Sequence, residues 1–437
     1  MKRLTLVALT IAIALFVVIR AARKGEGKGD DKTHGALERN YEFAGRLLQG
    51  SDPYARPQLH APYPPSYGIV LSPLRLFPLQ TARVVWALIQ LACFAALLLL
   101  LHTWYRTIDA AGPPLWVPLL AIVLVARYLS RDTSGGGGNL VWGTLVFFAA
   151  LRPGEPPGSD EKPWRGALLG IVLGAKPTPV LFLPWLWWRG RKRTLTVALV
   201  VALLLHVSPL FTLGVDGWLS AYGRWIDGVI AYSNQTDLFA MPSHDFPPFT
   251  WMHQSLRFAV TRFLATVPEE HVLDSPLFFQ GLGLEITTVA ITRRVLEAAI
   301  AGTTLFALWR ARARRSAWTD IHATSLLASA TLLLSPIVWK SYHLWLLPFF
   351  FGCLSHLATS KDDMGAGTKR RRRERIFGLA IYFVLCGLSS EMLLGQNGKE
   401  VMQSLYVVTA GALWAWSLSL RDLLRDHDSS KLDSQRS

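Results

Sequence analysis

The chain has 437 residues, of which 51% are hydrophobic and 17% are charged, and its formal net charge is +15. Several apolar runs are long enough to cross a bilayer, which takes about 20 helical residues. This composition excludes an ordinary soluble domain and predicts an all-α, polytopic membrane protein. Much of the positive charge lies in three clusters between apolar runs, at 189–193, 310–315 and 369–375. Such clusters are typical of cytoplasmic loops, and no nucleic-acid-binding motif accompanies them, so no nucleic-acid partner is expected.

The first apolar run, 4–20, has two interpretations. Its basic start fits a cleaved signal peptide, but basic residues follow the run where small residues favour cleavage. We therefore expect an uncleaved first span, followed by an outer segment at 21–80. Lysines and arginines at 23–32 oppose this orientation, because basic residues favour the cytoplasmic side. The next spans are expected at 81–103, 115–130 and 139–152, with the glycine-rich turn SGGGGNLVWG joining the last two.

The stretch RGALLGIVLGAKPTPVLFLPWLWWRGRKR, at 165–193, is predicted to form a re-entrant hairpin. Two prolines break the helix in its middle, and a lysine at membrane depth is costly unless it lines a polar cavity. In a hairpin both arms are short, both ends lie on the cytoplasmic side, and Lys176 lies at the tip. Irregular backbone at that depth is tolerated where it is buried in protein or lines water.

The rest of the chain is expected to form a bundle of about 10–12 transmembrane helices in total. The segment 216–286 and the turn SPIVWKSYH would lie outside, and both termini would lie in the cytoplasm. Residues 1–420 would form the membrane domain and 421–437 a disordered cytoplasmic tail. The remaining spans are expected at 194–215, 287–309, 318–338, 342–358, 376–394 and 401–420.

Five stretches within residues 35–350 resemble glycosyltransferase family 87, in the family's order. They are NYEFAGRLLQGSDPYA with APYPPSYGIVLSPLRLFPL, then GGGGNL, GALLGIVLGAKPTPVLFLP, WMHQSLRF and LLLSPIVWKSYHLWLLP. The resemblance implies a GT-C-like enzyme of the inner cell membrane. It would move a hexose, mannose by default, from a polyprenyl-phosphate donor to a lipid or glycan acceptor on the extracytoplasmic face. The reaction would invert the sugar and would need no metal or cofactor.

The chain departs from the family pattern in three places. The aspartate that usually lies about five residues before Tyr41 is replaced by Gly35 and Ala36. In the glycine turn, a glycine replaces the family's glutamine. After the SPxxW motif, Ser-Tyr replaces the His-His that the family often has. The first departure leaves the catalytic base open and makes an inactive relative an alternative to an enzyme.

Sugar transfer needs a base to take the proton of the acceptor hydroxyl. The candidate base is Asp31, followed by Asp30 and then Glu38. Each also has a structural interpretation. The two aspartates fit a solvated linker, and Glu38 fits the first turn of a helix, where a carboxylate favours the helix dipole.

The departing phosphate needs positive charge or hydrogen-bond donors. Lys176, Lys340 and His343 are the candidates, although a lysine can also snorkel and a histidine can lie at the interface. The candidates for binding sugar or acceptor are Tyr54, Tyr63, Asn139, Gln254 and Trp339. These residues also have structural interpretations, as residues that shape a loop, cap a helix or belong to the interfacial aromatic belt.

A transporter or lipid flippase is the competing class of function. Broken helices and an intramembrane lysine fit transporters, but these usually carry paired interrupted segments, and the chain shows one hairpin without a mate.

Overall fold

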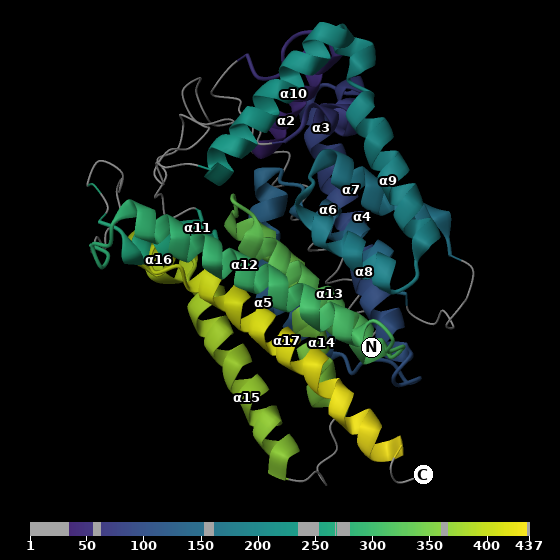
Figure 1. The fold of residues 1–437 in the computed structure, drawn as a ribbon, viewed down its shortest axis with the longest axis vertical. Helices are drawn as coiled ribbons and strands as arrows, with labels where there is room; N and C mark the ends of the chain where they lie inside the picture. Colours follow the sequence, from purple (N-terminus) through teal and green to yellow (C-terminus); the bar gives the residue numbers. More distant parts are fainter. Residues whose placement is uncertain are drawn as a thin grey trace.

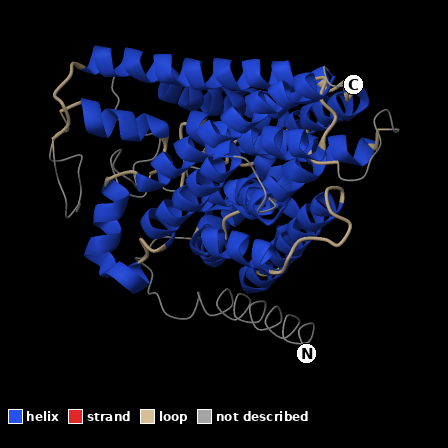
Figure 2. Ribbon diagram, turned by 90° about the horizontal axis from the view of Figure 1, so that it is seen from below, coloured by secondary structure: helices blue, strands red, loops and turns tan. Residues whose placement is uncertain are grey.

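The structure is a computed structural model, and it describes residues 35–55, 63–152, 161–234, 253–266, 268, 280–359 and 366–434. The described part contains helices and no strand, which confirms the predicted all-α fold (Figure 2). The first predicted span and the candidates Asp30 and Asp31 lie outside the described residues.

In the first half of the chain, the predicted spans at 81–103, 115–130 and 139–152 coincide with helices. The helices are α2 (Ala36–Leu48), α3 (Pro65–Leu71), η2 (Ser72–Leu76), α4 (Leu79–Arg106), α5 (Trp116–Gly135), α6 (Asn139–Ala150), α7 (Pro163–Ala175), η3 (Thr178–Leu181), α8 (Phe182–Trp188), α9 (Lys192–Val207) and α10 (Leu210–Asn234). The second half contains α11 (Leu256–Leu264), α12 (Ile286–Ala311), α13 (Ala317–Leu334), η5 (Lys340–Leu346), α14 (Leu347–Thr359), α15 (Ala366–Tyr382), η6 (Phe383–Gly387), α16 (Glu391–Ser404) and α17 (Val407–Ser434).

Among the described residues, α4 is the helix that is long and apolar enough by itself to cross a membrane. At ~1.5 Å per residue its 28 residues span roughly 42 Å, which exceeds the ~30 Å of a hydrocarbon core. Two bent pairs pass the same test together, Lys192–Val207 with Leu210–Ile230 and Leu393–Ser404 with Val407–Arg425. The number of spans predicted from the sequence stays a prediction.

The hairpin is confirmed by the packing of α7 against α9. Gly166 lies beside Thr194 and Gly174 beside Leu205, so the two helices run in parallel. The segment between them must therefore reverse direction at Lys176 and return through η3 and α8. A methyl group at Gly166 would lie 2.3 Å from the Thr194 carbonyl oxygen, and small residues at this spacing allow such close helix contact.

Polar side chains meet at two opposite ends of the bundle. The lysine end contains Lys176, the glycine turn and the start of α4, where Trp86 Nε1 donates to the Gly137 carbonyl at 3.0 Å. The arginine end contains the turn between α8 and α9 and the end of α4, where Trp104 Nε1 donates to the Ala317 carbonyl at 2.9 Å. The chain thus passes repeatedly between the two ends (Figure 1).

Four predicted spans differ from the observed helices, and one of them, 401–420, crosses the 53° bend between α16 and α17. The run 194–215 bends by 82° between α9 and α10, because Pro209 interrupts the helix. Helix α10 then crosses the lysine end next to α2 and α3 (Figure 1). The run 342–358 is divided between the 3-10 helix η5 and α14, and the run 376–394 contains a π-helical turn at 383–387.

The boundary predicted at 420/421 lies inside α17. Leu423 is fully buried, and Asp422 pairs with Arg375 of α15 at 2.6 Å. These two contacts hold residues after 420 against the bundle, so the helix continues where composition alone indicated a disordered tail. The division into a membrane domain and a tail stays a prediction.

Candidate active site

Lys176 is the centre of the polar cluster at the lysine end. It follows the last residue of α7, directly before Pro177, and its side chain is buried. Its Nζ donates to Asn139 Oδ1 at 3.0 Å and lies 3.4 Å from the centre of the Tyr342 ring. Among the described residues, the ammonium group contacts an amide oxygen and an aromatic face, and no carboxylate forms an ion pair with it.

Asp132 fixes the orientation of Asn139. Its Oδ1 accepts from Asn139 Nδ2 at 2.9 Å, and its Oδ2 accepts from the Leu140 backbone N–H at 3.0 Å. The carboxylate therefore caps the start of α6 and leaves Asn139 Oδ1 for the lysine. Asp132 was not among the residues predicted from the sequence, although an acid before a glycine-rich turn that ends in asparagine is a usable signal.

The glycine turn is required by this arrangement. Gly136 has φ +66°, a conformation that L side chains rarely adopt. A methyl group at Gly137 would lie 2.1 Å from Asp132 Oδ1. The turn therefore lets the end of α5 approach the start of α6 closely enough for one carboxylate to bind both.

Two residues of the SPIVWKSYH turn complete the cluster. Ser341 Oγ accepts from Asn139 Nδ2 at 3.1 Å, and Tyr342 supplies the ring under Lys176. Trp345 Nε1 donates to the Asn139 carbonyl at 2.9 Å. Ser341 and Tyr342 stand where the family often has histidines, so the departure from the family pattern lies directly in the site.

The aromatic loop forms a wall of the site. The Tyr63 and Tyr342 hydroxyls are 3.3 Å apart, and Tyr54 Oη donates to the Tyr63 carbonyl at 2.6 Å. The Tyr63 ring stacks on Tyr67 with centroids 4.2 Å apart. Burial raises the pKa of Tyr54, which lies in the loop, well above its usual value, so its hydroxyl remains a neutral donor. The two predicted tyrosines thus connect to Lys176 through Tyr342.

The other four candidates, Lys340, Gln254, Trp339 and His343, make their contacts outside the cluster around Asn139. Lys340 Nζ donates to Gln403 Oε1 at 2.5 Å, and Gln254 Nε2 donates to the Gln403 carbonyl at 3.0 Å. Trp339 packs against the His253 ring with centroids 4.4 Å apart. His343 is buried, and its ring lies against Tyr128. Of the three predicted phosphate ligands, the cluster around Asn139 contains Lys176, whereas the contacts of Lys340 and His343 lie elsewhere.

Glu38 is the one candidate base within the described residues. Its Oε2 accepts from the Gly35 backbone N–H at 2.6 Å, and its Oε1 forms an ion pair with Arg83. Oε2 thus caps the start of α2, as the structural interpretation expects, and Oε1 links α2 to α4. Glu38 also lines a small cleft with Arg83, Trp86 and the glycine turn, next to the Asp132 cluster.

These features define a polytopic helical membrane protein with a polar site at one end of its helices, an architecture suited to a substrate carried by a lipid. The model of glycosyltransferase family 87 matches residues 61–336, well over half of the chain. The chain belongs to this family, which confirms the resemblance seen in the sequence, and it is a membrane glycosyltransferase by family.

One curated relative is the polyprenol-phosphate-mannose-dependent alpha-(1-2)-phosphatidylinositol pentamannoside mannosyltransferase of Mycolicibacterium smegmatis. It is 25% identical over 293 residues, which cover 67% of this chain. The alignment spans 60% of the relative's own length. No solved structure was found to match the chain.

Proposed function

We propose that the protein moves mannose from a polyprenyl-phosphate donor to a hydroxyl of a lipid or glycan acceptor, on the extracytoplasmic side of the inner membrane. Family membership supports the reaction class. The relative is polyprenol-phosphate-mannose-dependent, which supports the choice of donor. The observation that carries the proposal is the ammonium group of Lys176, buried at the hairpin tip and held by neutral groups.

Lys176 is suited to a leaving phosphate. Its ammonium group contacts a neutral amide and a neutral ring, and no carboxylate of the described residues forms an ion pair with it. The positive charge is therefore available to stabilise an anion that enters the site. In the proposed step the acceptor oxygen bonds to the anomeric carbon as the bond from that carbon to the phosphate oxygen breaks. The polyprenyl phosphate leaves with the electron pair, and the sugar is inverted. No metal ion takes part in this proposed step.

The acceptor proton passes to a carboxylate. We propose Asp31 and Asp30 as the bases, since one oxygen of Glu38 caps the start of α2 and the other pairs with Arg83 of α4. The basic clusters at the arginine end support an extracytoplasmic location for the lysine end, because such clusters favour the cytoplasm.

The test is transfer from radiolabelled polyprenyl-phosphate mannose by purified protein in liposomes that contain membrane extract. We expect a labelled glycan or lipid from the wild type. Lys176→Met should lower transfer about 100-fold, since one preorganised donor is worth about that much. Lys192→Met is the matched control, because Lys192 lies at the arginine end, near the Trp187 ring.

Lys176→Arg keeps the positive charge and so tests whether charge alone is sufficient. Thermal unfolding of all variants shows whether a loss of transfer reflects a loss of folding. If the wild type transfers no sugar but carries the donor across the bilayer, the transporter interpretation replaces this proposal. If Lys176→Met folds and keeps full transfer, Lys176 does not bind the phosphate.

A further inference from the structure

The backbone that carries Lys176 lacks part of its helix hydrogen bonding. The last bond of α7 runs from the Lys176 N–H to the Val172 carbonyl at 2.6 Å. The Leu173 carbonyl would accept next from residue 177, but that residue is a proline and has no N–H. The Gly174 carbonyl is likewise one of the last four that a helix leaves without an internal partner. Both carbonyls therefore need donors from outside α7.

Ser66 supplies a donor for Gly174. It is the second residue of α3 and is fully buried, and its Oγ donates to the Gly174 carbonyl at 2.5 Å. Prolines at 64 and 65 precede it and restrict the backbone, which lowers the entropy cost of holding the hydroxyl in one place. The bond ties α3 to the backbone two residues before Lys176.

His206 brings α9 to the same point. Its Nδ1 lies 3.1 Å from Ser66 Oγ, and its ring interacts with the backbone of Leu173. The two carbonyls that α7 leaves without internal partners thus meet two polar side chains, one from α3 and one from α9.

Helix α10 holds the imidazole in place. The chain bends by 82° after α9, and this bend brings two aromatic residues of α10 to His206. Tyr222 Oη lies 2.9 Å from His206 Nδ1, and Trp218 Nε1 donates to the His206 carbonyl at 2.9 Å. The Tyr222 hydroxyl also donates to Ser66 Oγ at 3.4 Å. Ser66, His206 and Tyr222 therefore form one hydrogen-bonded group, which we refer to as the tip anchor.

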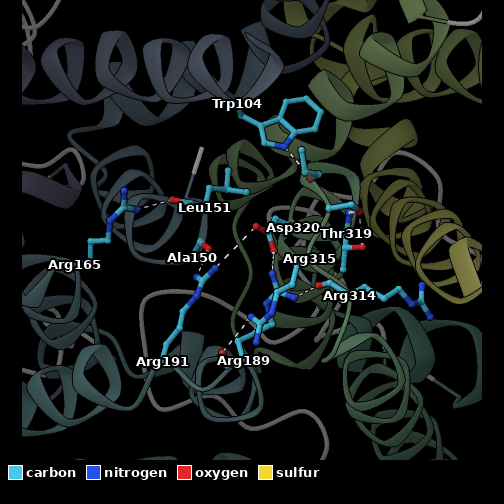
Figure 3. A network of polar contacts seen from close by, with 12 residues as sticks. Trp104, Ala150, Leu151, Arg165, Arg189, Arg191, Arg314, Arg315, Thr319 and Asp320 are labelled. Carbon is cyan, nitrogen blue, oxygen red and sulfur yellow. Dashed lines mark hydrogen bonds and ion pairs between the residues drawn. The ribbon is translucent and has the colours of Figure 1, made fainter. Parts of the chain in front are cut away.

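Side chains also cover helix-end carbonyls at the arginine end of the bundle. Arg165 Nη1 donates to the Leu151 carbonyl at 2.6 Å, and Arg191 Nη1 donates to the Ala150 carbonyl at 2.7 Å (Figure 3). Such bonds therefore also occur where they stabilise a helix end at the opposite side from Lys176. The tip anchor differs in its place, because the backbone that it holds carries the ammonium group of the sugar-transfer site.

We propose that the three residues of the tip anchor are positioning residues for sugar transfer, and that they hold the hairpin tip so that the Lys176 ammonium group meets the leaving phosphate. This inference rests on the proposed function. The cluster around Asn139 holds the end of the lysine side chain, whereas the tip anchor holds the backbone from which that side chain extends. A misplacement of about 1 Å can lower a rate about 100-fold, so support at both ends of the side chain matters.

The first test compares Ser66→Ala with the matched control Ser72→Ala. Ser72 Oγ also donates to a backbone carbonyl, that of Ile69 at 2.7 Å, but this bond lies within its own segment of the chain. Amide hydrogen exchange is measured by mass spectrometry on peptides that cover residues 176–180, with the full chain in liposomes. Ser66→Ala should speed exchange there, because the Gly174 carbonyl loses its donor, and Ser72→Ala should leave it unchanged. This measurement does not depend on transfer.

The second test is a double-mutant cycle with Lys176→Met, measured by transfer from radiolabelled polyprenyl-phosphate mannose. Ser66→Ala alone should lower kcat about 10-fold or more, because the ammonium group is displaced. In the Lys176→Met background it should have little further effect. Tyr222→Phe keeps the ring and loses the hydroxyl, so it should show the same pattern with a smaller loss. Ser72→Ala should keep kcat.

Either test can overturn the proposal. Equal fold losses from Ser66→Ala with and without Lys176 would mean that the serine does not act through the lysine. Unchanged exchange at 176–180 in Ser66→Ala would mean that the anchor does not hold the tip. If the wild type transfers no sugar, the proposed function fails, and the exchange contrast between the two serine variants still decides whether the anchor holds the tip. Tyr222→Phe replaces Ser66→Ala in both tests if the serine variant does not unfold cooperatively.

Discussion

Asp132 controls the site through the hydrogen bond that holds Asn139, whose Oδ1 in turn accepts from Lys176. In Asp132→Asn, an amide replaces a carboxylate that accepts from two neighbouring residues, so one donor is left with a poorer partner. The expected loss in the free energy of unfolding is about 1–3 kcal/mol. The rate of sugar transfer should fall by more than this loss of stability explains, because Asn139 no longer holds Lys176 in a fixed position. The measurement combines unfolding temperature with kcat and KM for the donor. Asp109→Asn is the control, because Asp109 also accepts a backbone N–H but in an exposed turn. Loss of stability with unchanged kcat and KM would restrict Asp132 to a folding role.

Tyr342 provides a second prediction at the residue scale. Its ring lies under Lys176, and its hydroxyl lies 3.3 Å from that of Tyr63. Tyr342→Phe keeps the ring and should keep most of the transfer rate, whereas Tyr342→Leu removes the cation–π contact. We expect Tyr342→Leu to lose about 5–30-fold in transfer, since such contacts contribute about 1–2 kcal/mol when buried. Equal rates in the two variants would show that the ring does not position the lysine.

At this scale the sequence predicted some site residues and missed others for a physical reason. Lys176 was identifiable because a lysine between prolines in an apolar run has few structural explanations. Asp132 directly follows Arg131 at the end of an apolar run, where an acid is ordinary for an interface. Lys340 and Ser341 are neighbours in the chain, yet they bind Gln403 and Asn139 on different sides. Sequence patterns do not contain such long-range partners.

At the scale of elements, the contact between α7 and α9 determines where the hairpin tip lies. A methyl group at Gly170 would lie 2.6 Å from the Ala198 carbonyl oxygen, whereas nothing lies within 4 Å of one at Gly228 of α10. Gly170→Ala should therefore destabilise the protein by about 1–3 kcal/mol, as overpacking does. Gly228→Ala should be neutral or stabilising, because alanine favours helices. Thermal unfolding of the two variants checks this contrast, and equal effects would exclude close packing as the role of Gly170.

The sequence predicted this hairpin but also predicted that α9 and the start of α10 form one span, because apolar residues continue through the bend at Pro209.

At the scale of the whole molecule, α4 connects the lysine end to the arginine end across a length greater than a hydrocarbon core. The two ends should therefore face opposite sides of the membrane. The chain offers an exposed serine at 51, beside Asp52 and thus near Arg224 of α10, and an exposed alanine at 313, between α12 and α13. After replacement of Cys93, Cys353 and Cys386, an impermeant maleimide should label Ser51→Cys from the outside of intact cells and Ala313→Cys only in inverted vesicles. Labelling of both from one side would contradict the two-ended arrangement. Labelling of each from the opposite side to that expected would keep the arrangement but place the sugar-transfer site in the cytoplasm, because Ser51 and Lys176 belong to the same end.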